Sequence, residues 1–415
     1  MKKQVELLSP AGSFESLQAA IRANADAVYF GVEQLNMRTR SANSFSIHDI
    51  KEISSTCKAN NVHTYITLNT VMYEHDMQLL KTILKEVKKQ KIDAVIASDI
   101  AVMEYCRQMN IPLHISTQAN ISNIEAVKFY SSFADVIVLA RELTLSQVKN
   151  ICTEVKRKNI TGPSGELIKI ELFVHGALCM AVSGKCYLSL HSQNASANRG
   201  ACVQNCRRPY LVKDAESGEE LIIDNQYIMS PKDLCTIDIL DQVIDTGADV
   251  LKIEGRTKGA DYVQVVTRCY REAIDAVSNG TYSLQKAAEW KKELEKVYNR
   301  GFWEGYYLGR KPGDWTKHPG SAATEKKVYI GKGTKYYPKI SVGEFLIEAG
   351  TIRAGDTLIA TGRHFGIKKE KVETLWVNGK EAAEAIKGDK ITFPIDAKVT
   401  PHDKLYKIAE REPNA

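Results

Sequence analysis

Residues 170–189 read IELFVHGALCMAVSGKCYLS, a short apolar run that passes directly into a segment with two cysteines. The run 170–174 has the length and composition of a β-strand that is buried on both faces. Seven other runs of this kind occur between residues 6 and 254, and their order along the chain decides the fold. They are Glu6–Pro10, Ala27–Gly31, Thr64–Asn69, Ala94–Ser98, Leu113–Thr117, Val136–Ala140 and Val250–Glu254.

Amphipathic stretches separate these runs. Phe14–Arg22, Asp76–Lys89 and Glu142–Lys156 have apolar residues at three- and four-residue steps, which predicts helices. Strands that alternate with helices imply a parallel sheet. Seven or eight units over roughly 260 residues favour a TIM-like (β/α)8 barrel. An open doubly wound sheet is disfavoured because no glycine-rich GxGxxG turn follows the first strand. Tyr227–Ser230 is either a further barrel strand or one arm of a hairpin with Tyr210–Lys213.

The sequence changes in character after residue 300. Residues 301–325 are rich in aromatic residues and glycine without a helical period, which predicts a linker after a barrel domain at 1–300. Residues 326–415 consist of short alternating runs with turn residues at about ten-residue spacing, which predicts a small all-β barrel domain. Because that domain has no cysteine, we expect a binding or docking module.

Composition sets limits on the class of protein. The 415 residues are 44% apolar and 26% charged, as in a soluble globular chain of two or three domains. The net charge of +6 permits a nucleic-acid partner without requiring one. No apolar run is long enough for a membrane helix, and the start MKKQVELLSPAG lacks the apolar stretch of a signal peptide. We therefore expect a cytoplasmic protein with no membrane contact.

Five of the nine cysteines lie within a segment at about 171–235, which we expect to be a cluster-binding insertion in the barrel. In the cytoplasm, clustered cysteines more often bind metal or catalyse than form disulfides. A zinc knuckle would favour CxxC pairs, and no histidine is marked as the base of a cysteine protease. Four thiolates from spaced loops suit a 4Fe-4S cluster, with the fifth left over. The five are Cys179, Cys186, Cys202, Cys206 and Cys235.

Polar residues occur where the predicted barrel strands end. In a (β/α)8 barrel such residues face the active-site mouth. The arginines among them indicate an anionic ligand, because guanidinium groups match carboxylates and phosphates. The candidate substrate-binding residues are Arg38, Asn69, Gln118, Arg141, His175 and Arg256, and Glu254 and Arg256 are the candidate catalytic residues.

The run ELFVHGALCMAVSGKCYLS resembles the signature of the collagenase-like peptidase family, whose catalytic type is unassigned. The stretches ELLSPAG, AVYFG, NRGACVQNCRRPY, SPKDL and LKIEGR are also similar to that family, as is the small C-terminal β domain. The resemblance therefore covers nearly the whole chain.

This resemblance implies two kinds of activity. The family name records proteolysis, whereas other members resemble oxygen-independent hydroxylases that carry a 4Fe-4S cluster. With one barrel and a β tail, the chain is most similar to the branch that forms 5-hydroxyuridine at the tRNA wobble position, with prephenate as oxygen donor. The alternatives are a collagenase-like peptidase and, more weakly, a non-enzymatic subunit that works with a homologous partner.

The same resemblance implies that four cysteines hold the cluster. Cys179 and Cys186 match the first pair, a third ligand falls on Cys202 or Cys206, and Cys235 is the candidate for the fourth.

The two carboxylates of prephenate would suit paired arginines such as Arg38 and Arg256. Glu254 is expected to orient Arg256 or to take a proton, with a buried ion pair that closes the barrel as the alternative. No Ser-His-Asp order and no HExxH motif supports a peptidase, and Ser189 with His191 is a weak dyad. The candidates for RNA contact are basic and aromatic: Arg207, Arg208, Tyr210 and the region around Arg310.

Overall fold

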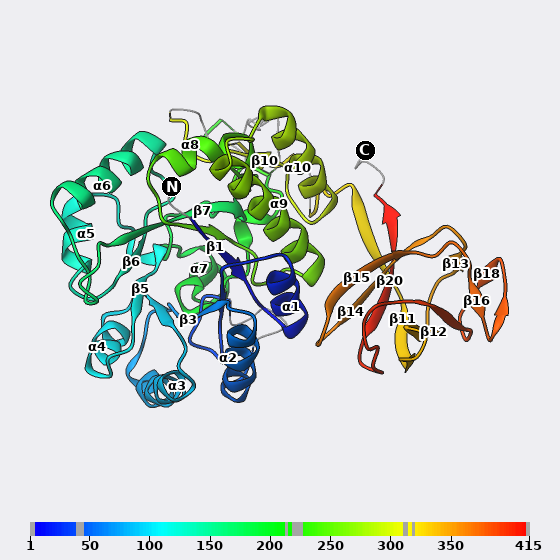
Figure 1. The fold of residues 1–415 in the computed structure, drawn as a ribbon. Helices are drawn as coiled ribbons and strands as arrows, with labels where there is room; N and C mark the ends of the chain where they lie inside the picture. Colours follow the sequence, from blue (N-terminus) through cyan, green and yellow to red (C-terminus); the bar gives the residue numbers. More distant parts are fainter. Residues whose placement is uncertain are drawn as a thin grey trace.

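A closed ring of parallel strands forms the N-terminal part of the molecule, and an antiparallel sheet lies beside it (Figure 1). The computed structural model describes residues 5–38, 45–211, 215–217, 227–309, 314–317 and 320–411. Strands β1 to β7 pair in chain order, β7 pairs with β9, and β9 pairs with β1. The ring consists of β1 (Glu6–Pro10), β2 (Ala27–Phe30), β3 (His63–Leu68), β4 (Ala94–Ala97), β5 (Leu113–Ile115), β6 (Val136–Val138), β7 (Lys169–Gly176) and β9 (Val250–Ile253). The predicted TIM-like barrel is thereby confirmed, with all eight apolar runs as its strands.

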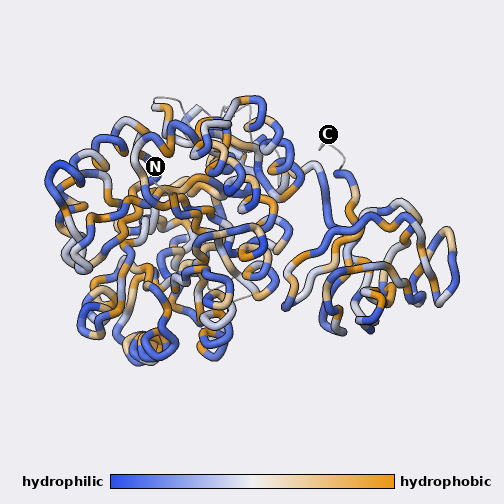
Figure 2. Tube along the Cα trace, viewed as in Figure 1, coloured by the Kyte–Doolittle hydropathy of each residue, from blue (hydrophilic) through white to orange (hydrophobic). Residues whose placement is uncertain are grey.

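Helices cover the outside of the ring, and their buried faces carry the predicted three- and four-residue periodicity. Figure 2 shows hydrophobic residues along the strands and hydrophilic residues on the outer helical surface. Side-chain caps fix the starts of α1, α4, α5, α6 and α10; in α1 and α6 the caps, Ser13 and Thr144, are part of a capping box. The outer helices are α1 (Phe14–Arg22), α2 (Ile50–Ala59), α3 (Met77–Gln90), α4 (Ile100–Gln108), α5 (Ile124–Tyr130), α6 (Leu145–Arg157), α8 (Leu240–Asp245), α9 (Ala260–Ser278) and α10 (Leu284–Lys296). No helix among the described residues is long and apolar enough to cross a membrane.

The cysteine-rich segment leaves the ring after β7. Its described part contains α7 (Leu188–Gln193) and returns through β8 (Asp233–Cys235), which pairs antiparallel with the end of β7. Tyr227–Ser230 forms a turn closed by Ser230 N–H donating to the Tyr227 carbonyl at 3.0 Å. It is therefore not a barrel strand, and part of its predicted hairpin partner, Tyr210–Lys213, lies outside the described residues.

The described part of the expected linker, 301–325, packs on the barrel rather than spanning between domains. Its strand β10 (Phe302–Trp303) pairs with β8, and Trp303 and Tyr307 are buried. The Tyr307 hydroxyl donates to the carbonyl oxygen of Phe173, inside β7, at 2.7 Å. The aromatic residues that suggested a linker are thus used to cover the barrel. Arg310 lies outside the described residues.

An antiparallel all-β region follows, as predicted. Its main sheet has the strand order β15-β14-β20-β11-β12-β19-β16-β17, and β13 pairs with β18. Phe345 and Phe393 stack at 5.0 Å between ring centroids in its separate apolar core. The strands are β11 (Glu325–Tyr337), β12 (Val342–Ile347), β13 (Ile352–Arg353), β14 (Thr357–Gly362), β15 (Gly366–Lys371), β16 (Trp376–Val377), β17 (Lys380–Glu381), β18 (Glu384–Ala385), β19 (Lys390–Pro394) and β20 (Lys404–Glu410).

This region docks on helices α1 and α9. Ile359 of β14 and Ile367 of β15 belong to the same apolar cluster as the barrel core. The guanidinium of Arg363 lies 3.5 Å from the ring centroid of Phe14 in α1. Lys327 forms an ion pair with Asp261 in α9 at 2.5 Å. Apolar and charged contacts therefore hold the two domains together.

A conservative substitution tests whether residues 301–309 are a structural part of the barrel. We expect Tyr307→Phe to lower the free energy of unfolding by about 1 kcal/mol, because it removes one buried hydrogen bond and little volume. The matched control is Tyr306→Phe, since the half-buried Tyr306 has no such bond with the described residues. Urea unfolding followed by tryptophan fluorescence measures the difference. Equal stability of the two variants would contradict the assignment.

Candidate active site

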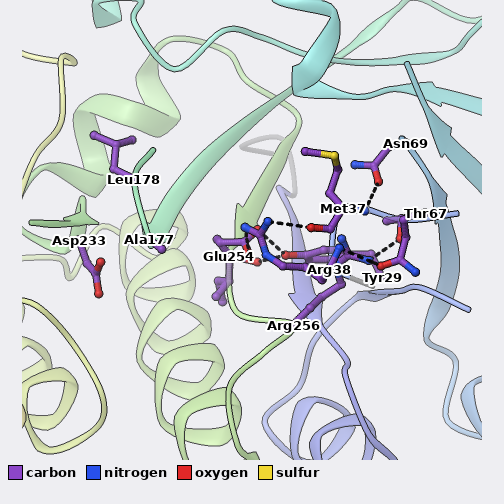
Figure 3. A network of polar contacts seen from close by, with 12 residues as sticks. Tyr29, Met37, Arg38, Thr67, Asn69, Ala177, Leu178, Asp233, Glu254 and Arg256 are labelled. Atoms are coloured by element: carbon purple, nitrogen blue, oxygen red, sulfur yellow. Dashed lines mark hydrogen bonds and ion pairs between the residues drawn. The ribbon is translucent and has the colours of Figure 1, made fainter. Parts of the chain in front are cut away.

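Polar side chains from the ends of five strands of the ring, β2, β3, β5, β6 and β9, meet at the barrel mouth. They enclose a cavity of about 40 Å³ that is lined by Arg38, Asn69, Gln118, Arg141, Glu254 and Arg256, together with Tyr29 and Thr67. Figure 3 shows Arg38, Glu254, Tyr29, Thr67 and Arg256 gathered at the strand ends, with Asn69 beside them. The structure thus brings together six of the seven residues that the sequence nominates for substrate binding and catalysis.

Glu254 lies in the middle of this group. Its Oε1 accepts a hydrogen bond from Arg38 Nη2 at 3.0 Å, and its Oε2 lies 3.4 Å from the Tyr29 hydroxyl. Burial alone would raise the pKa of Glu254, but the guanidinium groups of Arg38, Arg141 and Arg256 outweigh burial and lower the pKa to about 2. Glu254 is therefore a carboxylate at neutral pH, unsuited to donating a proton.

Arg256 is held in place by neutral groups. Its Nη1 donates to Asn36 Oδ1 at 3.1 Å and to Thr67 Oγ1 at 2.5 Å, and only 7% of the residue is exposed. Its Nε is buried without a partner among the described residues. Burial lowers the pKa of Arg256 to about 10, so it stays charged at neutral pH. No direct ion pair with Glu254 is present in the described structure; Arg38 makes that pair instead.

The side-chain amides of Asn69 and Gln118 extend the polar lining beyond Met37. Asn69 Nδ2 donates to Gln118 Oε1 at 3.1 Å and to Ser116 Oγ at 3.3 Å, and its Oδ1 accepts from the Met37 N–H at 3.3 Å.

Arg141 lies 3.9 Å above the Phe173 ring and donates to the Ala177 carbonyl at 3.0 Å. Its Nε, like that of Arg256, is buried and has no partner among the described residues.

The lining of the inner cavity has more positive than negative side chains. Four cations contribute to it, whereas Glu254 is its only carboxylate within the described residues. One cation, Lys252, is neutralised by Glu171 at 2.7 Å deeper in the barrel. The cations Arg38, Arg141 and Arg256 therefore face a single negative charge, which gives the mouth a net positive charge that suits an anion.

His175 does not reach this cavity, contrary to the expectation for a strand-end residue. It is 1% exposed, and its ring packs against Tyr262, Tyr270 and Phe302. The cause is a register shift in the pairing of β7 with β9 between Phe173 and His175. Side chains alternate between the two faces of a strand, so one extra residue turns His175 away from the barrel interior. Burial lowers its pKa to about 3.

A second, larger cavity adjoins the first. It has a volume of about 340 Å³ and is lined by Cys179, Cys202 and Cys206. It shares five lining residues with the inner cavity: Met37, Arg38, Gln118, Arg141 and Glu254. The arginine-rich mouth and the cysteines are therefore two compartments of one site.

The remaining two clustered cysteines differ from each other in position. Cys186 is half-buried and close enough to Cys206 to raise its pKa, although burial is the larger cause. Cys235 is buried on β8 with the Tyr270 hydroxyl 3.9 Å from its Sγ, and it does not line either cavity. All of these thiols are free. No three His, Cys, Asp or Glu side chains among the described residues already stand in a metal-binding arrangement.

Several lining residues escaped the sequence analysis. Tyr29 lies inside an apolar run and was indistinguishable from core, although its hydroxyl reaches the Ile253 carbonyl at 2.8 Å. Lys258 and Arg300 line the outer cavity, but Arg300 is distant from the motifs in sequence. A signal for Lys258 was available, since it follows Glu254 by four residues in the same loop motif, EGRTKG.

The candidates for RNA contact differ in whether they line the outer cavity. Arg207 lines the outer cavity, and Arg208 is exposed. The Tyr210 hydroxyl donates to the Asn205 carbonyl at 2.8 Å, which fixes its ring against the cysteine-rich segment.

The low pKa of Glu254 predicts a pH-dependent contribution to stability. Because the folded-state pKa of about 2 lies below the ordinary 4.5, the carboxylate stabilises the native state above pH 4.5, and this stabilisation is lost as the pH falls toward 2. We expect Glu254→Gln to cost about 3 kcal/mol at neutral pH and much less near pH 3. The control is the exposed Glu142→Gln, for which about 0.5 kcal/mol or less is expected. Urea unfolding across this pH range measures both, and a pH-independent cost would contradict the assignment.

Comparison with known proteins places the chain in a family. Residues 12–317 match the model of peptidase family U32. A Porphyromonas gingivalis protein named collagenase is 52% identical over 407 residues, 98% of each chain. A Bacillus subtilis protein named tRNA hydroxylation protein P1 is 31% identical over 98% of this chain and 95% of its own. An Escherichia coli protein named as a 23S rRNA 5-hydroxycytidine synthase is 34% identical over 75% of this chain and 46% of its own. The chain belongs to peptidase family U32.

Proposed function

We propose that this chain is an RNA-modifying hydroxylase that forms 5-hydroxyuridine at the tRNA wobble position without molecular oxygen. The observation that carries the proposal is the wall shared by the anion-binding mouth and the cysteine-lined cavity. Such a site can hold an anionic co-substrate beside a redox centre. The relatives named for tRNA hydroxylation and rRNA hydroxycytidine synthesis support an RNA substrate.

Cys179, Cys186, Cys202 and Cys206 are the ligands that we propose for a 4Fe-4S cluster. Their donor chemistry fits, because thiolates are the usual ligands of such clusters and all four thiols are free. Three of them line one cavity, and the fourth is an electrostatic neighbour of Cys206. When bound, the cluster would supply one-electron redox chemistry at the cavity wall. Cys235 is left out because it is buried behind the cavity beside Tyr270.

Prephenate is the oxygen donor that we propose. Replacing the C5–H bond of uridine by a C5–O bond oxidises the base by two electrons, which the donor must accept. The inner cavity of about 40 Å³ has room for little more than one water-sized group. We infer that one carboxylate enters it beside Arg38, Arg141 and Arg256, while the rest of the donor occupies the outer cavity.

Peptidase activity is the second candidate, favoured by the relative named collagenase. The described residues offer no nucleophile paired with a base. The Ser189 hydroxyl accepts from the Val203 N–H at 3.1 Å, and the His191 side chain is exposed. Burial raises the pKa of Cys235 to about 12, which disfavours the reactive thiolate. No histidine lines the outer cavity in the described structure.

Iron and sulfide quantitation in anaerobically purified protein tests the cluster. We expect one 4Fe-4S cluster per chain, lost in the separate alanine variants of Cys179, Cys186, Cys202 and Cys206. We expect Cys235→Ala to retain iron, although it loses some packing. Loss of iron in Cys235→Ala with retention in one of the other four would contradict the assigned set. Colourless, iron-free native protein would contradict the cluster itself.

Removal of one arginine charge tests the donor site. We expect Arg38→Met to weaken prephenate binding by roughly 10- to 100-fold, as for the loss of a charge-assisted hydrogen bond. Arg38 is chosen because it lines both cavities. Since the substitution also breaks the ion pair with Glu254, urea unfolding of the variant separates a loss of stability from a loss of binding. The control is Arg107→Met on the outer surface, where Arg107 pairs only with Glu104 among the described residues.

Mass spectrometry of tRNA nucleosides measures the product in the same variants. We expect 5-hydroxyuridine from the native chain and from Arg107→Met, and a large reduction from Arg38→Met. Unchanged affinity and product in Arg38→Met would contradict the donor site. Hydrolysis of gelatin by iron-free protein, without any RNA product, would favour the peptidase. Product formation by the purified chain alone would contradict the need for a homologous partner subunit.

A further inference from the structure

Three cationic side chains line the outer cavity without lining the inner one, and we call them the rim cluster. Arg207, Lys258 and Arg300 all line it, although they come from the cysteine-rich segment, from the loop after β9 and from the loop between α10 and β10. They are separate from Arg38 and Arg141, which line both cavities at the inner wall. The outer cavity therefore has positive charge on the wall that it shares with the inner cavity and also on the part of its lining that it does not share.

Two of the three cations are fixed in position. Arg300 Nη1 pairs with Asp233 at 3.1 Å, and its side chain is only 10% exposed. Arg207 donates to the Leu178 carbonyl at 2.6 Å and to Ser230 Oγ at 3.0 Å, and also to the Pro231 carbonyl. Neither arginine can move away from the rim without breaking these bonds.

The third cation is not neutralised by the described residues. The Lys258 ammonium lies 3.0 Å from the centroid of the Tyr298 ring, which is a cation–π contact, and no described carboxylate lies within ion-pair distance of it. Burial, followed by the charge of Arg300, lowers the pKa of Lys258 to about 7. Asp233 is already paired with Arg300, so this cluster has excess positive charge that an anion would relieve.

We propose that Arg207, Lys258 and Arg300 form a phosphate-binding subsite that holds the RNA backbone next to the base being modified. This inference rests on the proposed function and adds the residues that would position its substrate. A base that is turned out of its stack and enters a cavity leaves its sugar and phosphates at the entrance. The rim cluster lines the outer cavity only, whereas the inner arginines face the donor.

The three side chains fit a phosphate better than a second carboxylate donor. The two fixed guanidinium groups provide directed N–H donors, and the Lys258 ammonium provides a point charge, which are the two common ways of binding phosphate. Figure 3 shows Asp233 and Leu178, the partners of Arg300 and Arg207, on the side of Glu254 opposite to Asn69 and Thr67. The rim and the inner anion site thus lie on different sides of Glu254.

The salt dependence of RNA binding tests the subsite. The probe is a fluorescent RNA hairpin with the sequence of a tRNA anticodon arm, titrated at several KCl concentrations with anaerobically purified full-length protein. We expect Lys258→Gln to weaken binding roughly tenfold or more at low salt. We also expect it to reduce the slope of log affinity against log salt by about 0.7, the value for one single-strand phosphate contact. The matched control is Lys292→Gln, an exposed lysine on α10 away from both cavities, which should leave both quantities unchanged.

A chemically altered RNA locates the contact on the substrate. A hairpin with an uncharged methylphosphonate beside the target uridine should bind the native protein roughly tenfold more weakly than the unmodified hairpin does. The same change should cause little further loss in Lys258→Gln. This comparison needs only the native protein for its first part, so it remains decisive if the variant folds poorly.

The outcomes separate the subsite from the reaction. Equal affinity and slope for Lys258→Gln and Lys292→Gln, with normal 5-hydroxyuridine formation, would overturn the subsite alone. The expected loss of slope without any hydroxylated product would support the subsite and overturn the reaction. Failure of the native protein to bind the hairpin would overturn both.

Discussion

The buried charge of Glu254 is the constraint on which the mouth of the barrel depends. Glu254 follows β9, the last strand of the ring, and its main partner, Arg38, lies in the loop after β2. Leaving either charge unpaired in this environment would cost several kcal/mol. The ion pair therefore fixes the loop that also carries Asn36 and Met37, and through Asn36 it positions the guanidinium of Arg256.

Much of the fold was predictable because the spacing of apolar residues along the sequence reflects which faces of a strand or helix are buried. The eight strands of a parallel barrel are apolar on both faces, so each stands out from the amphipathic helices around it. The same reasoning located Arg38, Asn69, Gln118, Arg141, Glu254 and Arg256, since residues after parallel strands share one end of a barrel. It could not identify β8 or β10, which are only three and two residues long.

The predictions for His175 and for the partner of Glu254 were wrong for local physical reasons. His175 was expected at the mouth, but a bulge of β7 against β9 reverses its direction, and nothing in the sequence marks that bulge. The pairing of Arg256 with Glu254 seemed natural from their spacing, yet Arg38 makes the pair because it approaches from another loop. For the cysteines, the sequence indicated a cluster but did not distinguish its members. Their spacing predicted convergence, but only the folded chain separates Cys235 from the four near the cavity.

The docking of the C-terminal sheet has a consequence for how the barrel stays closed. The ring is completed where its first strand, β1, meets its last, β9. The helices that follow these two strands are α1 and α9, and both are covered by the C-terminal sheet through Ile359, Ile367, Arg363 and Lys327. The sheet thus contacts both helices beside the junction of β1 and β9 and links the two ends of the ring. Separation of β1 from β9 would move α1 and α9 apart. Local opening of the barrel at this strand pair would therefore require the C-terminal domain to detach first.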